Sequence, residues 1–143
     1  MKAYIFGLFT CFMIFFPNWA FCGGDKIVIT KEELSGQRNM DLETIEALKR
    51  NGSDLSKAHI LEHHFYVFSE KSAKRLSEKG ISLGYKTSKI QPGNYEGNSY
   101  WYFDLIKPTI PEIDIVIKET TLMLKLAKEF DAEYDGWGTN VVE

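Results

Sequence analysis

Cysteine is nearly absent from this sequence of 143 residues, and neither of its two copies lies in the main body of the chain. Cys11 and Cys22 both fall in an apolar segment at the N-terminus. The remaining residues can therefore form neither a disulfide bond nor a thiolate metal site. The folded part must be held together by its own hydrophobic core, and about 120 residues are enough to build one.

Other absences narrow the function. The sequence has no glycine-rich phosphate loop, no low-complexity tract and no tandem repeat, and no nucleophile–base set can be assembled from it. The net charge of −3 does not suit a general nucleic-acid binder, which needs lysine and arginine against phosphates. We expect no catalytic residue, no cofactor and no metal, and an acidic domain suited to a basic protein surface.

The composition is that of an ordinary globular protein, with 44% hydrophobic and 26% charged residues. Residues 1–22 differ from the rest. Lys2 precedes a run without charge over 3–16, which Pro17 ends, and this pattern is typical of a secretory signal peptide. An uncleaved membrane anchor and lipidation at Cys22 remain alternatives. We expect an exported, periplasmic or membrane-anchored protein.

The rest of the chain divides into a linker or arm over 23–38 and one domain over 39–143. Hydrophobic periodicity and turn residues predict a helix at 41–50, a strand at 58–68, a helix at 69–83, a strand at 85–90, a loop at 91–98, a strand at 99–106, a helix ending near 130 and an extended segment at 132–142. Thr109 and Glu112 predict a capping box at the start of the last helix, with Pro111 in its first turn.

After the first, short helix the predicted order is βαββαβ. This order is typical of an α+β, ferredoxin-like split βαβ sandwich, with an antiparallel sheet and two helices on one face.

Three short segments, in the same order and at nearly the same spacing, resemble the RraB family of regulators of ribonuclease E activity. They are the turn NGSD at 51–54 with the strand ILEHHF at 60–65, LGY at 83–85, and EYDGWG at 133–138. The matching residues are Glu62, His63 and His64 in the strand, and Tyr134, Gly136 and Gly138 near the C-terminus. The resemblance covers about residues 40–143.

The resemblance implies a ferredoxin-like fold and a non-enzymatic protein that binds ribonuclease E and restrains RNA processing. An exported chain could not meet that enzyme inside the cell. Either an N-terminal anchor leaves the domain facing the cytoplasm, or the partner is an envelope or secreted protein. An exported immunity-type protein that neutralises a toxin enzyme is the alternative, because small acidic domains suit that role through charge complementarity.

Histidine supplies the first candidate site residues. In a strand, His59 and His63 point to one face and His64 to the other. Four residues along a strand span about 13 Å, too far for two ligands of one zinc ion. We therefore expect one histidine to pack at the sheet and another to face water.

The C-terminal segment supplies the candidate partner-binding residues. Asp131, Glu133 and Asp135 alternate and should share one face, either as a solvated acidic edge or as a surface for a basic partner. Trp137, between two glycines, either fills the core or is presented at an interface. The aromatic run at 100–103 could resemble an RNA-stacking face, which the acidic balance disfavours.

Overall fold

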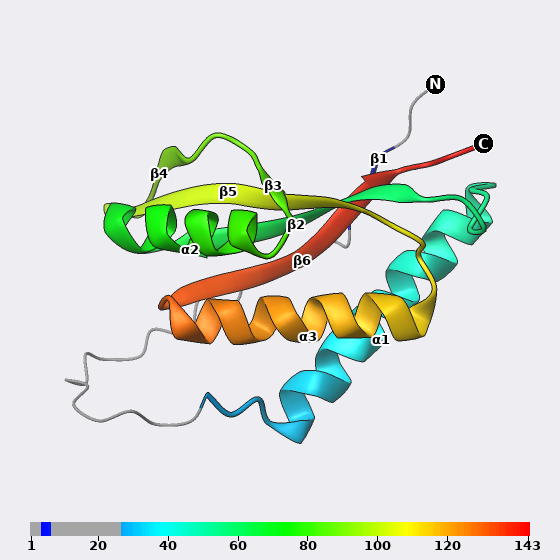
Figure 1. Cartoon of the computed structure of the whole chain (residues 1–143), viewed down its shortest axis with the longest axis horizontal. Coiled ribbons are helices and arrows are strands. Elements are labelled where there is room, and N and C mark those ends of the chain that lie inside the picture. Colours follow the sequence, from blue (N-terminus) through cyan, green and yellow to red (C-terminus); the bar gives the residue numbers. More distant parts are fainter. Residues whose placement is uncertain (1–3, 7–26) are drawn as a thin grey trace.

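The computed structural model describes residues 4–6 and 27–143 and has an α+β architecture (Figure 1). The helices are α1 (Lys31–Arg50), α2 (Glu70–Ser82) and α3 (Ile113–Glu129). The strands are β1 (Tyr4–Phe6), β2 (His59–Val67), β3 (Lys86–Thr87), β4 (Gln91–Tyr95), β5 (Asn98–Thr109) and β6 (Ala132–Asn140).

The strands form one antiparallel sheet in the order β1-β6-β2-β5-β3, with β4 also paired to β5. Without α1 and β1, the chain runs β-α-β-β-α-β. In this order β3 and β4 count as one strand, because both pair with β5 at successive positions along it. The spatial order β6-β2-β5-β3 is the fourth, first, third and second strand of that unit. This arrangement is the split βαβ sandwich, and the predicted ferredoxin-like fold is confirmed.

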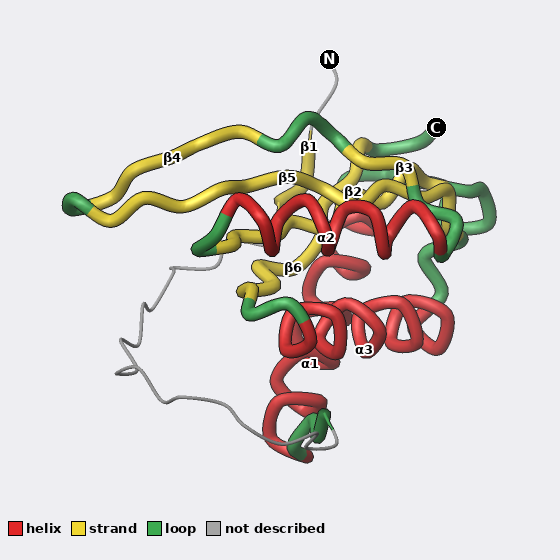
Figure 2. The backbone as a smooth tube through the Cα atoms, turned by 60° about the vertical axis from the view of Figure 1, so that its left-hand side comes forward, coloured by secondary structure: helices red, strands yellow, loops and turns green. Residues whose placement is uncertain are grey.

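The two faces of the sheet differ in what covers them. The odd-numbered residues of β2, from His59 to Val67, are all buried, while the even-numbered residues between them are partly or fully exposed. All the described helices lie on one side of the sheet (Figure 2). We call the side with the helices the helical face and the opposite side, which carries the even-numbered residues of β2, the open face.

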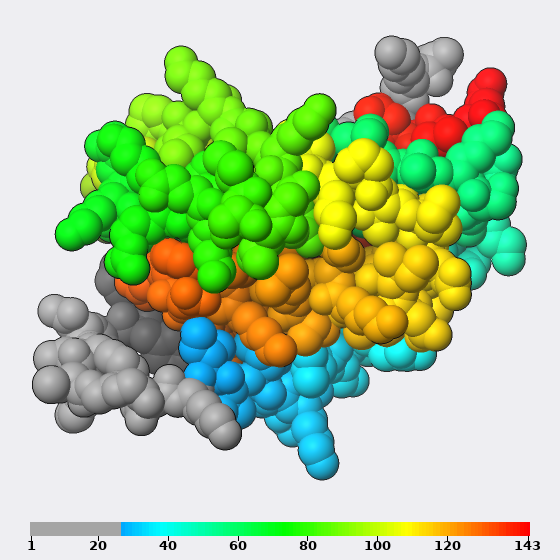
Figure 3. All heavy atoms as spheres, viewed as in Figure 1, coloured from blue at the N-terminus to red at the C-terminus, as the bar shows by residue number. Residues whose placement is uncertain are grey.

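Two apolar clusters fill the helical face. The larger one lies under α2 and α3 and is built around Phe65, Phe103, Leu105, Met123 and Leu126. The smaller one joins α1 and α3 to the sheet through Leu48, Leu61, Val116 and Trp137, with Ile45 at its margin. The space-filling view shows α2 and α3 next to each other on this side of the molecule (Figure 3). The smaller cluster is what fastens α1 to the rest of the domain.

Helix α1 begins at Lys31, well before the predicted start at Asp41, and takes in the second half of the segment predicted as a linker or arm. Thr30 is the N-cap: its Oγ1 accepts from the backbone N–H of Glu33 at 3.1 Å, and its own N–H donates to Glu33 Oε2 at 2.7 Å. This reciprocal pair satisfies two backbone donors at the helix start. The buried side chain of Gln37 then joins the added turns to the core.

The predicted capping box of the last helix is wrong. Thr109 is the last residue of β5, where it pairs with His59 of β2, and α3 begins only at Ile113. Glu112 is the N-cap, and its side chain makes no capping hydrogen bond. Pairing with β2 holds Thr109 in the sheet, so its side chain cannot serve the helix.

The segment at 91–98, predicted as a loop, is also different. It forms β4 and the turn of a hairpin with β5, whose turn residues Glu96 and Gly97 have positive φ angles of 49° and 83°. Such angles are typical of the tight turn that suits twisted antiparallel strands. The hairpin projects beyond the helices (Figure 2). The predicted strand at 85–90 shrinks to the two residues of β3.

The predicted N-terminal signal or anchor segment lies outside the described residues, except for β1, which pairs with the C-terminal end of β6. In the described part of the chain, no helix combines the length and apolar character needed to span a bilayer.

Candidate functional site

A β-bulge in β6 organises the most specific motif of the sequence. Phe65 of β2 pairs with Tyr134 and His63 pairs with Trp137, so Asp135 and Gly136 together face the single residue between them. Gly136 has a φ of 94°, a backbone conformation that glycine adopts without strain. Because of the extra residue, Tyr134 and Trp137 both point to the helical face although they are three positions apart.

Trp137 is a core residue, 3% exposed. Its indole packs in the smaller apolar cluster, and its Nε1 donates to Oδ1 of Asp41 at 3.0 Å. Of its two predicted roles, this position matches the packing role. Presentation at an interface would require an exposed indole.

Asp41 is the centre of a buried polar group that the sequence did not reveal. Besides Trp137, Gln37 Nε2 donates to its Oδ1 at 2.9 Å and Thr120 Oγ1 donates to its Oδ2 at 2.8 Å. Burial raises the pKa of Asp41, while the three hydrogen bonds act against that rise. One carboxylate thus joins α1, α3 and β6. The sequence offers one indication of this role: Asp41 is an acidic residue on the same helix face as the apolar residues Ile45 and Leu48.

His63 is fully buried on the helical face beneath Tyr134. Its Nδ1 lies 2.8 Å from the Tyr134 hydroxyl, and its Nε2 has no hydrogen-bond partner among the described residues. Burial, followed by the nearby charges of His64 and Lys107, lowers the pKa of His63 to about 3. His63 is therefore neutral under ordinary conditions. Burial also raises the pKa of Tyr134 well above its usual value.

The second motif histidine takes the opposite face, in agreement with the alternation predicted for the strand. His64 Nδ1 lies 2.6 Å from Asp104 Oδ1 of β5 on the open face. Glu62 is on the same face, between Ile106 of β5 and Gly138 of β6. The motif Glu-His-His therefore places one buried imidazole in the core and two polar groups on the open face.

The three acidic residues predicted to share a face do so only in part. Glu133 pairs with Tyr66, and Asp135 lies opposite His64, both on the open face. Asp131 precedes β6, is exposed, and has a φ of 52° that takes it out of the alternation. Burial raises the pKa of Glu133, helped by the charge of Asp135, and burial also raises the pKa of Asp135, against the effect of His64.

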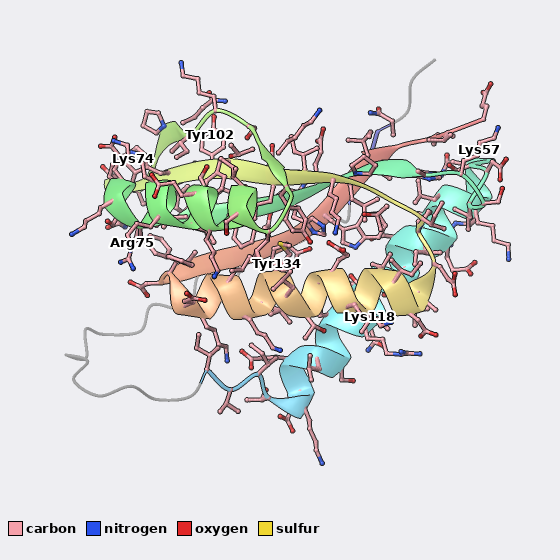
Figure 4. The ribbon with its side chains drawn as sticks, in the orientation of Figure 1. Lys57, Lys74, Arg75, Tyr102, Lys118 and Tyr134 are labelled. Atoms are coloured by element: carbon pink, nitrogen blue, oxygen red, sulfur yellow. The ribbon has the colours of Figure 1, made fainter. Side chains whose placement is uncertain are left out.

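Aromatic side chains flank these carboxylates. Tyr66 lies 5.6 Å from Tyr100 and 6.5 Å from Tyr102, and the latter two are 6.1 Å apart, all measured between ring centroids. Tyr102 and Tyr134 leave the sheet on opposite sides (Figure 4). The open face thus combines a tyrosine cluster with Glu133, Asp135 and Asp104.

The Gly-Ser-Asp turn of the motif has a structural role. Ser53 Oγ accepts from the backbone N–H of Val142 at 2.9 Å and lies 2.7 Å from His59 Nε2, and the Asp54 N–H donates to the Val142 carbonyl at 2.7 Å. Gly52 ends the preceding helix with a φ of 78°. The turn therefore fastens the C-terminal residues to the start of β2.

Tyr85, from the third motif segment, closes the helical face at the edge of the sheet. Its hydroxyl donates to Glu119 of α3, which also accepts from Lys107 Nζ at 2.9 Å. Burial, with the hydrogen bond and charge of Glu119, raises the pKa of Tyr85. Among residues 27–143, no cluster of three or more histidine, cysteine or acidic side chains is placed to hold a metal ion.

Known proteins share this pattern over most of the chain. The family model described as RraB, regulator of ribonuclease activity B, matches residues 38–139. A relative from Pseudoalteromonas atlantica, named regulator of ribonuclease activity B, is 28% identical over 119 residues, covering 80% of this chain and 99% of the relative.

Two further relatives bear the same name. The protein from Escherichia coli is 28% identical, covering 76% of this chain and 79% of its own length. The protein from Haemophilus ducreyi is 30% identical, covering 75% of this chain and 76% of its own length. The family match runs from the middle of α1 to the end of β6, and the bulge, the buried histidine and the Gly-Ser-Asp turn all fall within it. The chain belongs to the RraB family of regulators of ribonuclease activity.

Proposed function

We propose that this protein binds a ribonuclease of the ribonuclease E type and restrains it, acting through a binding surface and not through catalysis. The family match over residues 38–139 carries the proposal, because relatives that align with about three quarters or more of this chain are named as regulators of ribonuclease activity.

The positions of the ionisable side chains favour binding over catalysis. His63 is buried and neutral, and Asp41 is held by three hydrogen bonds inside the core. Both groups hold elements together. The polar and aromatic groups of the open face, by contrast, are spread over three strands, as in a protein-binding surface.

A cleavage assay tests this function. The purified chain is added to the ribonuclease E of the same organism, and the rate of cleavage of a structured RNA substrate is followed. We expect the rate to fall with added chain and to level off once the enzyme is saturated. The heat-denatured chain is the control. An unchanged rate with the folded chain at saturating concentrations would contradict the proposal.

We further propose that residues 1–22 direct export or membrane anchoring. A reporter active in only one compartment, fused to Glu143, decides which side of the membrane the domain occupies. A cytoplasmic signal supports an anchored regulator that reaches the ribonuclease. An exported signal would make an envelope or secreted protein the partner to seek, and a toxin enzyme encoded beside this chain would then favour the immunity-type alternative.

A further inference from the structure

The open face carries aromatic rings in a fixed arrangement. The rings of Tyr66 and Tyr100 meet edge to face, and the ring of Tyr102 is tilted against both of them. The Tyr100 ring lies so closely over Gly93 of β4 that a Cβ at that glycine would come within 2.3 Å of it. Tyr102 is 37% exposed and Tyr95, on the same face of the hairpin, is 53% exposed. Rigid, partly exposed rings of this kind provide contact area at a small loss of side-chain entropy.

The acidic groups lie in register with these rings. Glu133 pairs with Tyr66, and Tyr66 pairs with Tyr102, so the three side chains form one row across β6, β2 and β5. The next row holds Asp135, His64 and Asp104. Since adjacent strands are about 4.8 Å apart, the carboxylates of Glu133 and Asp135 lie within about 10 Å of the tyrosine rings on the neighbouring strands.

The face has an unbalanced charge. Glu133, Asp135 and Asp104 lie on it, with Asp104 beside the His64 imidazole, and the strand pairing places one lysine, Lys86, on the same face. Within the described part of the chain, the side-chain carboxylates of Glu133 and Asp135 accept no hydrogen bond and form no ion pair, although the backbone of Glu133 pairs with Tyr66 in the sheet. Both are partly buried, and burial raises the pKa of each. A cation placed beside them would relieve this unfavourable burial.

We propose that the open face binds an extended, arginine-rich segment of the partner protein, with guanidinium groups placed between the tyrosine rings and the carboxylates of Glu133 and Asp135. This inference rests on the proposed function and names the chemistry of the partner. Arginine suits the surface better than lysine, because its planar group both stacks on aromatic rings and forms paired hydrogen bonds with carboxylates. Phosphate groups would meet the carboxylates of Glu133, Asp135 and Asp104, so this face disfavours RNA.

Binding of a synthetic probe tests the proposal. The full chain is titrated with a fluorescent peptide in which arginine alternates with serine, and with a matched peptide of lysine and serine. We expect saturable binding that weakens with added salt and is stronger for the arginine peptide. In the variant Glu133→Gln/Asp135→Asn the dissociation constant should rise about tenfold or more, because two charge-assisted contacts are lost.

A matched control separates this surface from net charge. Glu78→Gln/Glu129→Gln removes the same charge from exposed positions on α2 and α3. It should change the dissociation constant by less than about twofold, since such distant exposed charges are largely screened. Tyr102→Ala, which keeps every charge, should also weaken binding. Thermal unfolding of each variant verifies that the fold is kept.

The proposal would be overturned if both charge variants weakened peptide binding equally, or if the arginine peptide bound no better than the lysine peptide. It would also be overturned if the chain bound a single-stranded RNA oligonucleotide and the variant Glu133→Gln/Asp135→Asn bound that RNA more tightly. The cleavage assay shows whether the proposed binding surface or the proposed function is wrong. If the open-face variants restrain the ribonuclease as well as the unaltered chain, the function stands and the surface is wrong. If the peptide binds and the ribonuclease is not restrained, the surface stands and the partner is a different protein.

Discussion

At the scale of single residues, buried polar side chains join the separate elements of this protein. Asp41 and His63 lie inside the domain, and their partners come from helices and strands distant in sequence. A buried polar group left without a hydrogen-bond partner destabilises the fold, so removing one partner has a larger effect than the net energy of the bond suggests.

Replacement of Asp41 by alanine should destabilise the protein strongly. The donors on Gln37, Thr120 and Trp137 would lose their common acceptor, and we expect a loss of about 3 kcal/mol in the free energy of unfolding. Urea denaturation measures it. The control is Glu43→Ala on the exposed side of the same helix, which should change stability by less than about 0.5 kcal/mol. Similar small losses for both variants would show that Asp41 does not hold α1 in place.

His63 makes stability depend on pH. Its pKa is about 3 in the folded chain and near the ordinary 6.5 when unfolded, so between these values the unfolded chain binds more protons and stability rises with pH. Compared with His63→Gln, which does not titrate, the unaltered protein should gain up to about 1.4 kcal/mol per pH unit from about pH 4 to about pH 6. The gain should level off above about pH 6.5. Denaturation curves for both proteins at several pH values measure this difference, and a constant difference would mean that His63 is not buried in its neutral form.

At the scale of elements, the bulge in β6 decides which side chains reach the core. Without the extra residue at Asp135 and Gly136, Tyr134 and Trp137 would point to opposite faces of the sheet. The positive φ of Gly136 makes this arrangement possible.

Gly136→Ala should therefore destabilise the protein by about 1–2 kcal/mol, because alanine is strained at a φ of 94°. Gly36→Ala is a matched control, since a Cβ at either glycine would meet no atom within 4 Å. Gly36 lies inside α1, where alanine should instead stabilise by about 0.5–1 kcal/mol. Thermal or chemical unfolding distinguishes the two signs, and a neutral Gly136→Ala would show that the bulge does not depend on the conformational freedom of glycine at this position.

The elements show how far local sequence predicts this structure. Strand β2, α2 with its Ser69 cap, and β6 follow from periodicity and turn residues. Strand β4 does not, because Pro92, Gly93 and Asn94 are typical of a loop and become a strand only through pairing with β5 and the Tyr100 ring. Likewise, Thr109 does not cap α3 as predicted, because it pairs with His59 in the sheet, and this long-range pairing cannot be read from the local sequence.

The candidate site could be predicted less completely. Glu133 and Asp135 share a face as alternation indicates, while Asp131 leaves the strand at a turn with positive φ. The contribution of β5 to the open face, above all Tyr102 and Asp104, depends on the register with β2. The acceptor role of Asp41 depends on three elements that meet only in the folded chain.

At the scale of the whole molecule, the helices and the open face have separate roles. The helices and the helical face hold the core, the buried histidine and the Asp41 group. The open face gathers tyrosines and carboxylates from three strands, and we expect the partner there. Substitutions on the helical face should therefore lower stability, and substitutions on the open face should lower binding with little change in stability.

The most direct measurement is a calorimetric titration of the purified chain into the ribonuclease E of its organism. We predict a saturable complex that weakens as salt is added, and a dissociation constant that rises about tenfold or more for Glu133→Gln/Asp135→Asn but less than about twofold for Glu78→Gln/Glu129→Gln. The absence of any complex between the folded chain and the enzyme at micromolar concentrations would contradict the proposal that this RraB-family protein regulates a ribonuclease by binding it.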